Sequence, residues 1–135
     1  MKVSILEQSV SVEGKPQSVT IQDSINLAKK AEKLGYKRFW VSEHHNHPTI
    51  IGTAPEILMA AIACNTSSIR IGSAGIMLPH YSPLKVAEQF RVLEAIAPNR
   101  IDLGLGRAPG SDGRTALALN PNSRSDSEHF PSHVR

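Results

Sequence analysis

Apolar segments along the chain recur at a nearly constant interval. Strand-like runs begin near Val3, Lys37, Ile69 and Arg100, and successive runs are about 30 residues apart, the length of one strand plus one helix. Strands that alternate with helices predict a parallel sheet with right-handed crossovers. The pattern therefore predicts an α/β fold of about four βα units.

Two of the predicted helices have clear ends. Residues 18–34 carry an apolar stripe at spacings of three and four, and Gly35 follows as a residue that tolerates positive φ. A later helix begins at Ser82, shows apolar side chains on one face and is stopped by Pro98. Each of these helices is expected to bury one apolar face.

The helix between them differs, because residues 57–64 are apolar nearly all round. Thr53 is placed to cap its first turn, Glu56 can reach back to the cap, and Pro55 is harmless in the first turn. We expect this helix to be buried on more than one side. Cys64, the only cysteine, is expected to be a small buried hydrophobe.

The fourth strand is predicted over residues 100–106, where apolar residues alternate with Asp102, Gly104 and Gly106. Glycine on one face leaves room for something to approach the backbone. The chain then turns polar, with one helical turn expected at residues 115–119 and a polar loop or tail over residues 120–135. The predicted domain covers residues 1–119.

Length and composition limit the architecture and the function classes. A chain of 135 residues with 40% hydrophobic content supports a single core. Four βα units form either a small open sheet or half of an eightfold barrel, whose complete form takes about 250 residues. In a half-barrel, the first and fourth strands would have unsatisfied edges.

Charge and hydropathy argue against two classes of partner. The net charge is +3, the basic residues are scattered and aromatic residues make up 4% of the chain, which is unlike a nucleic-acid binder. No run approaches the roughly 20 apolar residues of a membrane span, and the first residues are too poor in apolar positions for a signal peptide. We expect a cytoplasmic protein with no nucleic-acid or membrane partner.

Candidate chemistry follows the predicted strands, because the carboxyl ends of parallel strands open into the ligand crevice. An imidazole exchanges protons near neutral pH, a neighbouring carboxylate fixes its tautomer, and a guanidinium binds a phosphate or oxyanion. Glycine and alanine keep a floor clear for a flat ligand. The strand ends carry Gln8 and Ser9; Glu43, His44 and His45; Ala74 and Gly75; and Gly106 and Arg107.

Alternatives stay open for some of these residues. Adjacent residues in extended backbone point to opposite faces, so only one of His44 and His45 easily faces a ligand. His44 is either that residue or a packed core histidine. Arg107 either binds an anion or pairs with Asp102 or Asp112.

A metal-dependent hydrolase is a third function hypothesis. The spacing of His45 and His47 resembles that of paired metal ligands at a strand end. Such a site needs further ligands, and beyond the run 44–47 His80 is the only histidine before residue 120. We expect His47 to be solvated in a loop and assign no metal ligand.

Three blocks of sequence carry a resemblance to a known family. They are LGYKRFWVSEHH at residues 34–45, GSAGIMLP at 72–79 and PNRIDLGLGR at 98–107. In this order they resemble the amino-terminal half of the bacterial luciferase-like, flavin-dependent monooxygenases, over residues 1 to about 119. The resemblance implies a truncated TIM (βα)8 barrel, of which this chain forms the amino-terminal half, about four βα units.

The resemblance also implies an activity. Such enzymes bind reduced FMN at the strand ends and oxidise an aldehyde or similar small organic substrate with O2, and the flavin carries the oxygen chemistry. His44 is similar to the acid–base histidine beside the flavin, with Glu43 next to it, so these two are the catalytic candidates. A flavin reductase and a second copy of the chain, as a homo-oligomer, are the implied protein partners.

Four further residues are cofactor-binding candidates, and three of them match cofactor positions in the family. Ala74 and Gly75 match a non-proline cis peptide beneath the flavin ring. Arg107 matches a residue that contacts the FMN phosphate, and Gly106 precedes it. The family's other phosphate-binding segments come from later strands, so the isolated chain is expected to bind FMN poorly or not at all. An alternative of a different class is a non-catalytic half-barrel that assembles through its exposed strand edges.

Overall fold

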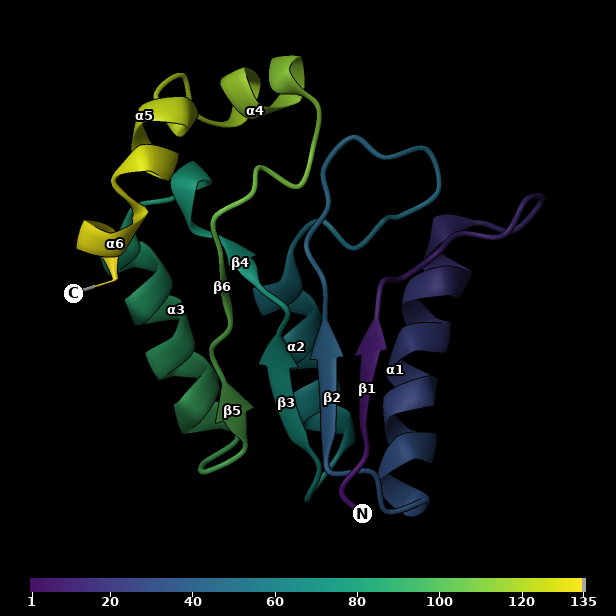
Figure 1. The fold of residues 1–135 in the computed structure, drawn as a ribbon. Coiled ribbons are helices and arrows are strands. Elements are labelled where there is room, and N and C mark those ends of the chain that lie inside the picture. Colours follow the sequence, from purple (N-terminus) through teal and green to yellow (C-terminus); the bar gives the residue numbers. More distant parts are fainter. Residues whose placement is uncertain (135) are drawn as a thin grey trace.

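The computed structural model describes residues 1–134 and contains a parallel sheet of four strands in the order β1-β2-β3-β5 (Figure 1). The register pairs Ile5 with Phe39, Phe39 with Ile71 and Ile71 with Ile101. The strands are β1 (Ser4–Glu7), β2 (Arg38–Val41), β3 (Arg70–Ser73) and β5 (Ile101–Asp102). The predicted α/β fold of four βα units is confirmed, and β1 and β5 form the two edges of this sheet.

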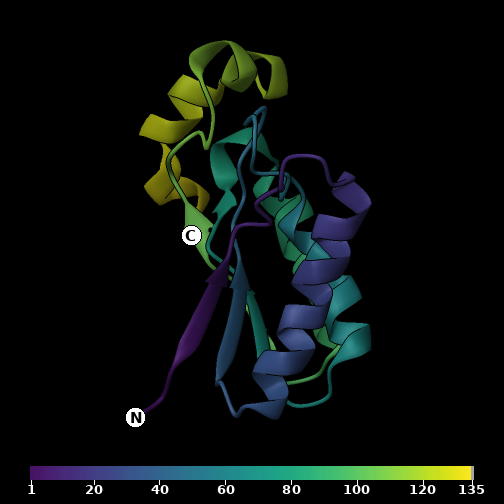
Figure 2. The same cartoon turned by 90° about the vertical axis from the view of Figure 1, so that its right-hand side faces the viewer.

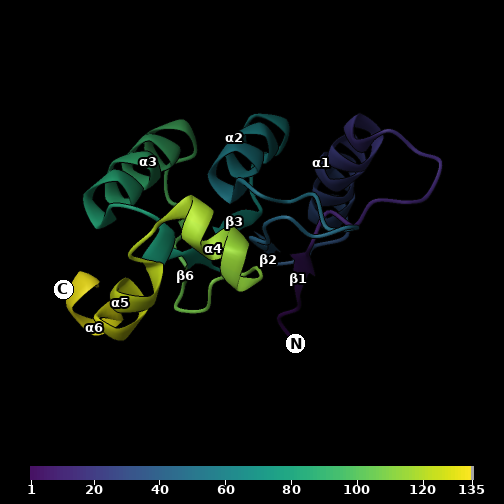
Figure 3. The ribbon, with the colours of Figure 1, turned by 90° about the horizontal axis from the view of Figure 1, so that it is seen from above.

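Three helices cover one face of the sheet: α1 (Gln17–Lys33), α2 (Pro55–Asn65) and α3 (Pro83–Ile96). Figure 3 shows them in a row on one side of the strands, and Figure 2 shows β1 on the opposite, uncovered side. The core lies between the helices and the sheet, and its fully enclosed side chains include Phe39, Met59, Ile62 and Ile71. Within residues 1–134 no helix layer covers the second face of the sheet.

Two helix ends follow the sequence and one differs. Gly35 adopts φ 79° after α1, as predicted, and α3 ends before Pro98. At α2, Pro55 takes the first helical position. The residue before a proline favours extended backbone, so Ala54 becomes the N-cap and makes no side-chain cap. The predicted capping box of Thr53 and Glu56 is therefore wrong.

Helix α2 is also less buried than its composition predicts. Its inner side packs in the core through Met59 and Ile62, but Ile57 on the outer side is 69% exposed. Cys64 is exposed rather than buried. The all-round apolar character of this helix therefore leaves apolar side chains on the molecular surface.

The predicted fourth strand, residues 100–106, is interrupted after Asp102. Its second part, β6 (Leu105–Gly106), leaves the main sheet and pairs with β4 (Ile76–Met77). The Ser73 hydroxyl donates to the Gly104 carbonyl at 2.8 Å and the Gly104 amide donates to the same hydroxyl at 3.0 Å. These side-chain bonds replace the regular ladder at Gly104, and the strand cannot continue in one sheet.

The uncovered face of the sheet carries a polar cluster around Asp102. Its carboxylate accepts from Trp40 Nε1 at 3.1 Å, from the Arg70 guanidinium, and lies 3.4 Å from Arg38 Nε. Burial alone would raise the pKa of Asp102, but the hydrogen bonds from Arg70 and Trp40 outweigh it and the pKa is lowered. Gly72 must be glycine here, because a Cβ would lie 2.5 Å from Trp40 Nε1.

The carboxyl-terminal segment is more structured than the sequence predicts. The helical turn expected at residues 115–119 lies within α4 (Gly113–Leu119), and the expected polar loop contains α5 (Ser123–Glu128) and α6 (Phe130–His133). The Asn120 amide ties this segment to the body, because it donates to the Pro79 carbonyl at 2.7 Å. Residue 135, the last of the expected tail, lies outside the described residues. The domain boundary at 119 stays a prediction.

Candidate active site at the strand ends

A fully buried carboxylate lies at the end of β2. Glu43 has no exposed surface. Its Oε1 accepts from His45 Nε2 and from the Tyr81 hydroxyl, each at 2.6 Å, and its Oε2 accepts from the Met77 amide at 2.9 Å. These bonds join the end of β2 to β4 and to the residue after η1 (Leu78–His80).

Tyr81 is held in its protonated form by this environment. Burial, followed by the hydrogen bond and the negative charge of Glu43, raises the pKa of Tyr81 far above its ordinary value. The Tyr81 hydroxyl is therefore a permanent donor to the carboxylate.

The two adjacent histidines have different surroundings. His44 is half-buried, and its Nδ1 is enclosed without a hydrogen-bond partner. His45 has a side chain that is 9% exposed and is fixed at Nε2 by Glu43. The ring of His45 lies edge-on to that of His80, with centroids 5.6 Å apart. The structure thus gives His45, rather than His44, a carboxylate that orients its ring.

The loop after β6 closes over this group. The His45 amide donates to the Gly110 carbonyl at 2.9 Å, and His80 Nε2 donates to the Pro109 carbonyl at 2.7 Å. His80 Nδ1 is enclosed without a partner. The ends of β2, β4 and β6 therefore meet at one place, as the parallel topology predicts.

The small residues of the predicted cofactor floor contact the chain itself. The peptide bond between Ala74 and Gly75 is cis, as the family resemblance implies. A Cβ on Gly75 would lie 2.8 Å from the Gly104 carbonyl, and one on Gly106 would lie 2.9 Å from Met77 Sδ. On that side the glycines let neighbouring chain approach the backbone closely, as the sequence predicts, and a floor for a flat ligand stays a prediction.

Arg107 lies on the surface and is held near α5. Its Nε donates to the Ser127 carbonyl at 2.9 Å. It pairs with neither Asp102 nor Asp112, the two alternatives that the sequence left open, because Asp102 binds Arg38 and Arg70 and Asp112 caps α4. Within residues 1–134, the two terminal guanidinium nitrogens of Arg107 make no hydrogen bond or ion pair. They suit a phosphate.

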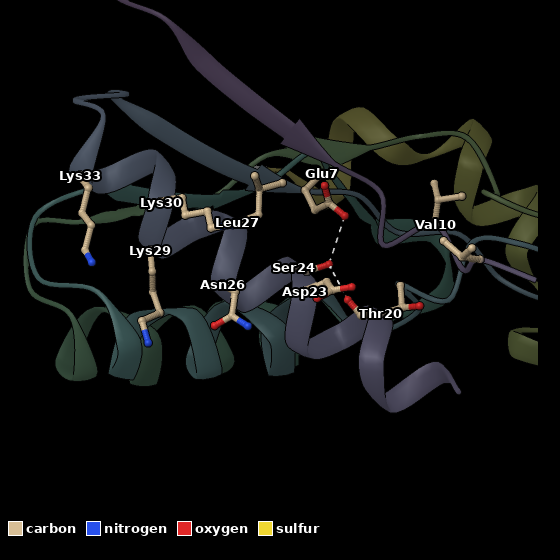
Figure 4. Close-up of a pocket in the computed structure, with 11 residues that line it drawn as sticks. Glu7, Val10, Thr20, Asp23, Ser24, Asn26, Leu27, Lys29, Lys30 and Lys33 are labelled. Carbon is tan, nitrogen blue, oxygen red and sulfur yellow. Dashed lines mark hydrogen bonds between the residues drawn. The ribbon is translucent and has the colours of Figure 1, made fainter. Parts of the chain in front are cut away.

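Two cavities lie away from this group. One, of about 530 Å³, lies between α1 and the end of β1 (Figure 4). There the Ser24 hydroxyl donates to the Glu7 carboxylate at 3.1 Å, and the Ser9 amide donates to the same oxygen at 2.8 Å. The other, of about 930 Å³, lies between α2 and α3. No sequence-predicted catalytic or cofactor residue lines either cavity, and the convergence of His44, Ala74–Gly75 and Arg107 around one hollow stays a prediction.

Metal binding has no support in the described part of the chain. No group of three or more His, Cys, Asp or Glu side chains there is arranged to hold a metal ion. His47 instead accepts at Nδ1 from the amides of Thr49 and Ile50, at 3.2 and 3.1 Å. It is an exposed residue that shapes its own loop.

Comparison with known proteins defines the class. Residues 1–125 match the family described as luciferase-like monooxygenase. The chain belongs to this family. It is 54% identical over 130 residues to the N-acetyl-S-alkylcysteine monooxygenase of Bacillus subtilis (strain 168). The aligned residues are 96% of this chain and 39% of that protein. It is 46% identical over 131 residues to a luciferase-like monooxygenase of Escherichia coli (strain K12), with 97% and 39% covered.

Solved structures extend the likeness to the fold. Apo-MsnO8 has a TM-score of 0.93 and 47% identity, over 98% of this chain and 40% of that one. The oxygenating constituent of 3,6-diketocamphane monooxygenase from Pseudomonas putida, solved with FMN, has a TM-score of 0.82 at 23% identity, over 96% and 38%. The chain thus spans about 40% of the length of these relatives and folds as the amino-terminal βα units of their TIM barrel.

Sequence reasoning found some members of the site and missed others. Glu43, His44 and His45 follow directly from their position after a strand. Tyr81 and His80 were not assigned to the active site, although both lie shortly after the strand-end residues Ala74 and Gly75. The Met77 amide carries no sequence signal, because every residue except proline has a backbone donor.

Proposed function

We propose that the chain is the amino-terminal part of an FMN-dependent monooxygenase that oxidises an aldehyde or similar small organic substrate with O2. Family membership and 54% identity to a monooxygenase support the reaction class, and the FMN complex of a fold relative supports the cofactor. The proposal rests mainly on one observation: buried Glu43 and the histidines around it lie where the carboxyl ends of β2, β4 and β6 meet.

The donor set fits a flavin mononucleotide. Arg107 offers two unengaged guanidinium nitrogens for the phosphate, and Ala74, Gly75 and Gly106 would lie against the ring. Bound FMN would supply the reaction with O2. His44 would exchange a proton with the bound group or its substrate, and Glu43 holds the neighbouring imidazole of His45. The reduced cofactor makes a flavin reductase a fitting partner, and the cytoplasm a fitting location. Within residues 1–134 no helix is long and apolar enough to cross a membrane.

The outer face of α2 and α3 suits a second copy of the chain. Ile57 is 69% and Val92 61% exposed on the cavity between these helices. The same lining carries Glu56 and Glu88 with Lys85, so two copies related by a two-fold axis can pair opposite charges. We therefore extend the proposal to a homo-oligomer through this face.

The alternative of a half-barrel assembly module is favoured by the open edge of β1. Leu6 on that strand is 57% exposed, and β1 has a neighbour on one side only. Analytical ultracentrifugation separates the two interfaces. A dimer that Leu6→Lys dissociates and Ile57→Lys does not would favour edge pairing, and the reverse would favour the α2–α3 face.

A chimera tests the monooxygenase proposal. The 130 residues of this chain that align with the Bacillus subtilis N-acetyl-S-alkylcysteine monooxygenase, at 54% identity, replace the matching segment of that enzyme. We expect the chimera to bind reduced FMN and to oxidise the relative's substrate, and His44→Ala or Arg107→Ala to weaken these activities. Arg114→Ala is the matched control, since Arg114 is another exposed arginine, seven positions further on in α4. A chimera that folds but binds no flavin would contradict the proposal.

A further inference from the structure

Three donors converge on the carboxylate of Glu43, and they differ in what else they can do. The Met77 amide can only donate, whereas the His45 nitrogen and the Tyr81 oxygen can each donate or accept. His45 and Tyr81 share Oε1 at 2.6 Å, and Met77 occupies Oε2 at 2.9 Å. An ionised carboxylate only accepts, so all three groups must donate to it.

This arrangement selects one tautomer of His45. Nε2 carries the proton that Glu43 accepts, so Nδ1 of the neutral ring carries the lone pair. Nδ1 of His45 makes no hydrogen bond within the described residues, and it is not among the enclosed polar atoms without a partner. Neither ring nitrogen of His44 makes a hydrogen bond within the described residues, and its Nδ1 is enclosed. The nitrogen that is both oriented and open therefore belongs to His45.

We propose that Glu43 is a positioning residue that fixes His45 in the Nε2–H tautomer and makes Nδ1 of His45 a second proton acceptor of the site. The consequence for catalysis rests on the proposed function. The step is a proton transfer: a proton that is covalently bonded to a substrate or cofactor atom moves to Nδ1. The bond from that atom to hydrogen breaks, its electron pair stays on the atom, and a new N–H bond forms. The imidazolium keeps its Nε2–H bond to Glu43, whose charge stabilises it.

Glu43→Gln tests the assignment because glutamine offers one oxygen and one NH2 group in the same shape. The Met77 amide requires the oxygen, since it cannot accept. The NH2 group must then face His45 and Tyr81, and both can switch to accepting. We expect His45 to change to the Nδ1–H tautomer in this variant.

The measurement is a long-range 1H–15N correlation spectrum of the 15N-labelled chain at about pH 9, well above the usual histidine pKa of about 6.5. His45→Gln identifies the signals of His45. The expected result is Nε2–H in the wild-type chain and Nδ1–H in Glu43→Gln. Tyr81→Phe is the matched control, because it removes the other donor to Oε1 and should leave the Nε2–H tautomer unchanged.

Three results would overturn the proposal: Nδ1–H in the wild-type chain, Nε2–H retained in folded Glu43→Gln, or a tautomer change in Tyr81→Phe. If Glu43→Gln does not fold, the wild-type and Tyr81→Phe spectra still decide. The spectra need no flavin. A chain that passes this test while the chimera binds no FMN would contradict the proposed function and leave the role of Glu43 standing.

Discussion

Glutamine at position 32 would test how α1 holds the turn that leads into β3 and its strand-end residues. Glu32 Oε1 accepts from the amides of Ser67, Ser68 and Ile69 at 2.9, 2.6 and 2.9 Å. It also accepts from the Ser68 hydroxyl at 3.1 Å. Burial alone would raise the pKa of Glu32, but these hydrogen bonds outweigh it and lower the pKa from 4.5 to about 2.

The pKa shift sets the size of the effect. One pKa unit corresponds to about 1.4 kcal/mol, so the whole shift corresponds to about 3 kcal/mol of stability at neutral pH. Water reaches Glu32 and screens its interactions, which reduces the expected loss to about 1–2 kcal/mol. Because the folded-state pKa of Glu32 is depressed, this stability is present above pH 4.5 and is lost as the pH falls toward 2.

Urea unfolding of wild type and Glu32→Gln, at neutral pH and near pH 2, measures the effect. We expect the variant to be less stable by about 1–2 kcal/mol at neutral pH and nearly equal to wild type at the acid end. Glu13→Gln is the control, because Glu13 is exposed and makes no hydrogen bond or ion pair within residues 1–134. An equal loss at both pH values, or an equal loss in Glu13→Gln, would refute the assigned role of the Glu32 charge.

Two further predictions concern the sheet and the site. Gly72→Ala places a Cβ 2.5 Å from Trp40 Nε1, so the free energy of unfolding in urea should fall by about 1–3 kcal/mol. Gly113→Ala is the control: its Cβ meets nothing within 4 Å, so stability should be nearly unchanged. In a Tyr36→Phe background, tyrosinate absorbance should appear only as the protein unfolds in alkali. The raised pKa of Tyr81 contributes stability that is complete below its ordinary pKa of 10.0 and lost above it, and Glu43→Gln should shift the ionisation to lower pH. Ionisation near pH 10 in folded Tyr36→Phe, where Tyr81 is the only tyrosine, would contradict the Glu43–Tyr81 contact.

The pattern of the chain predicted the elements that depend on local residues. The helices α1 and α3 end where Gly35 and Pro98 stop them, and the three sequence blocks pointed to the family that the comparisons show. The strand ends carry their polar residues because parallel strands place them there.

The features that sequence missed depend on contacts between distant residues. The fourth strand breaks because Ser73, 31 positions away, bonds to both backbone groups of Gly104. The N-cap of α2 lies one residue later than predicted, because a proline restricts the backbone of the residue before it. Which of His44 and His45 Glu43 holds could not be read from their order, since it depends on the contact of Glu43 with His45 and on the loop at Gly110.

Equilibrium titration with reduced FMN tests the central claim most directly. The chimera should bind FMN with micromolar or tighter affinity, Arg107→Ala should weaken that binding, and the isolated 135-residue chain should bind poorly or not at all. Micromolar or tighter binding by the isolated chain, or a folded chimera in which Arg107→Ala changes nothing, would contradict the claim that residues 43–45, 74–75 and 107 form one part of a larger flavin site.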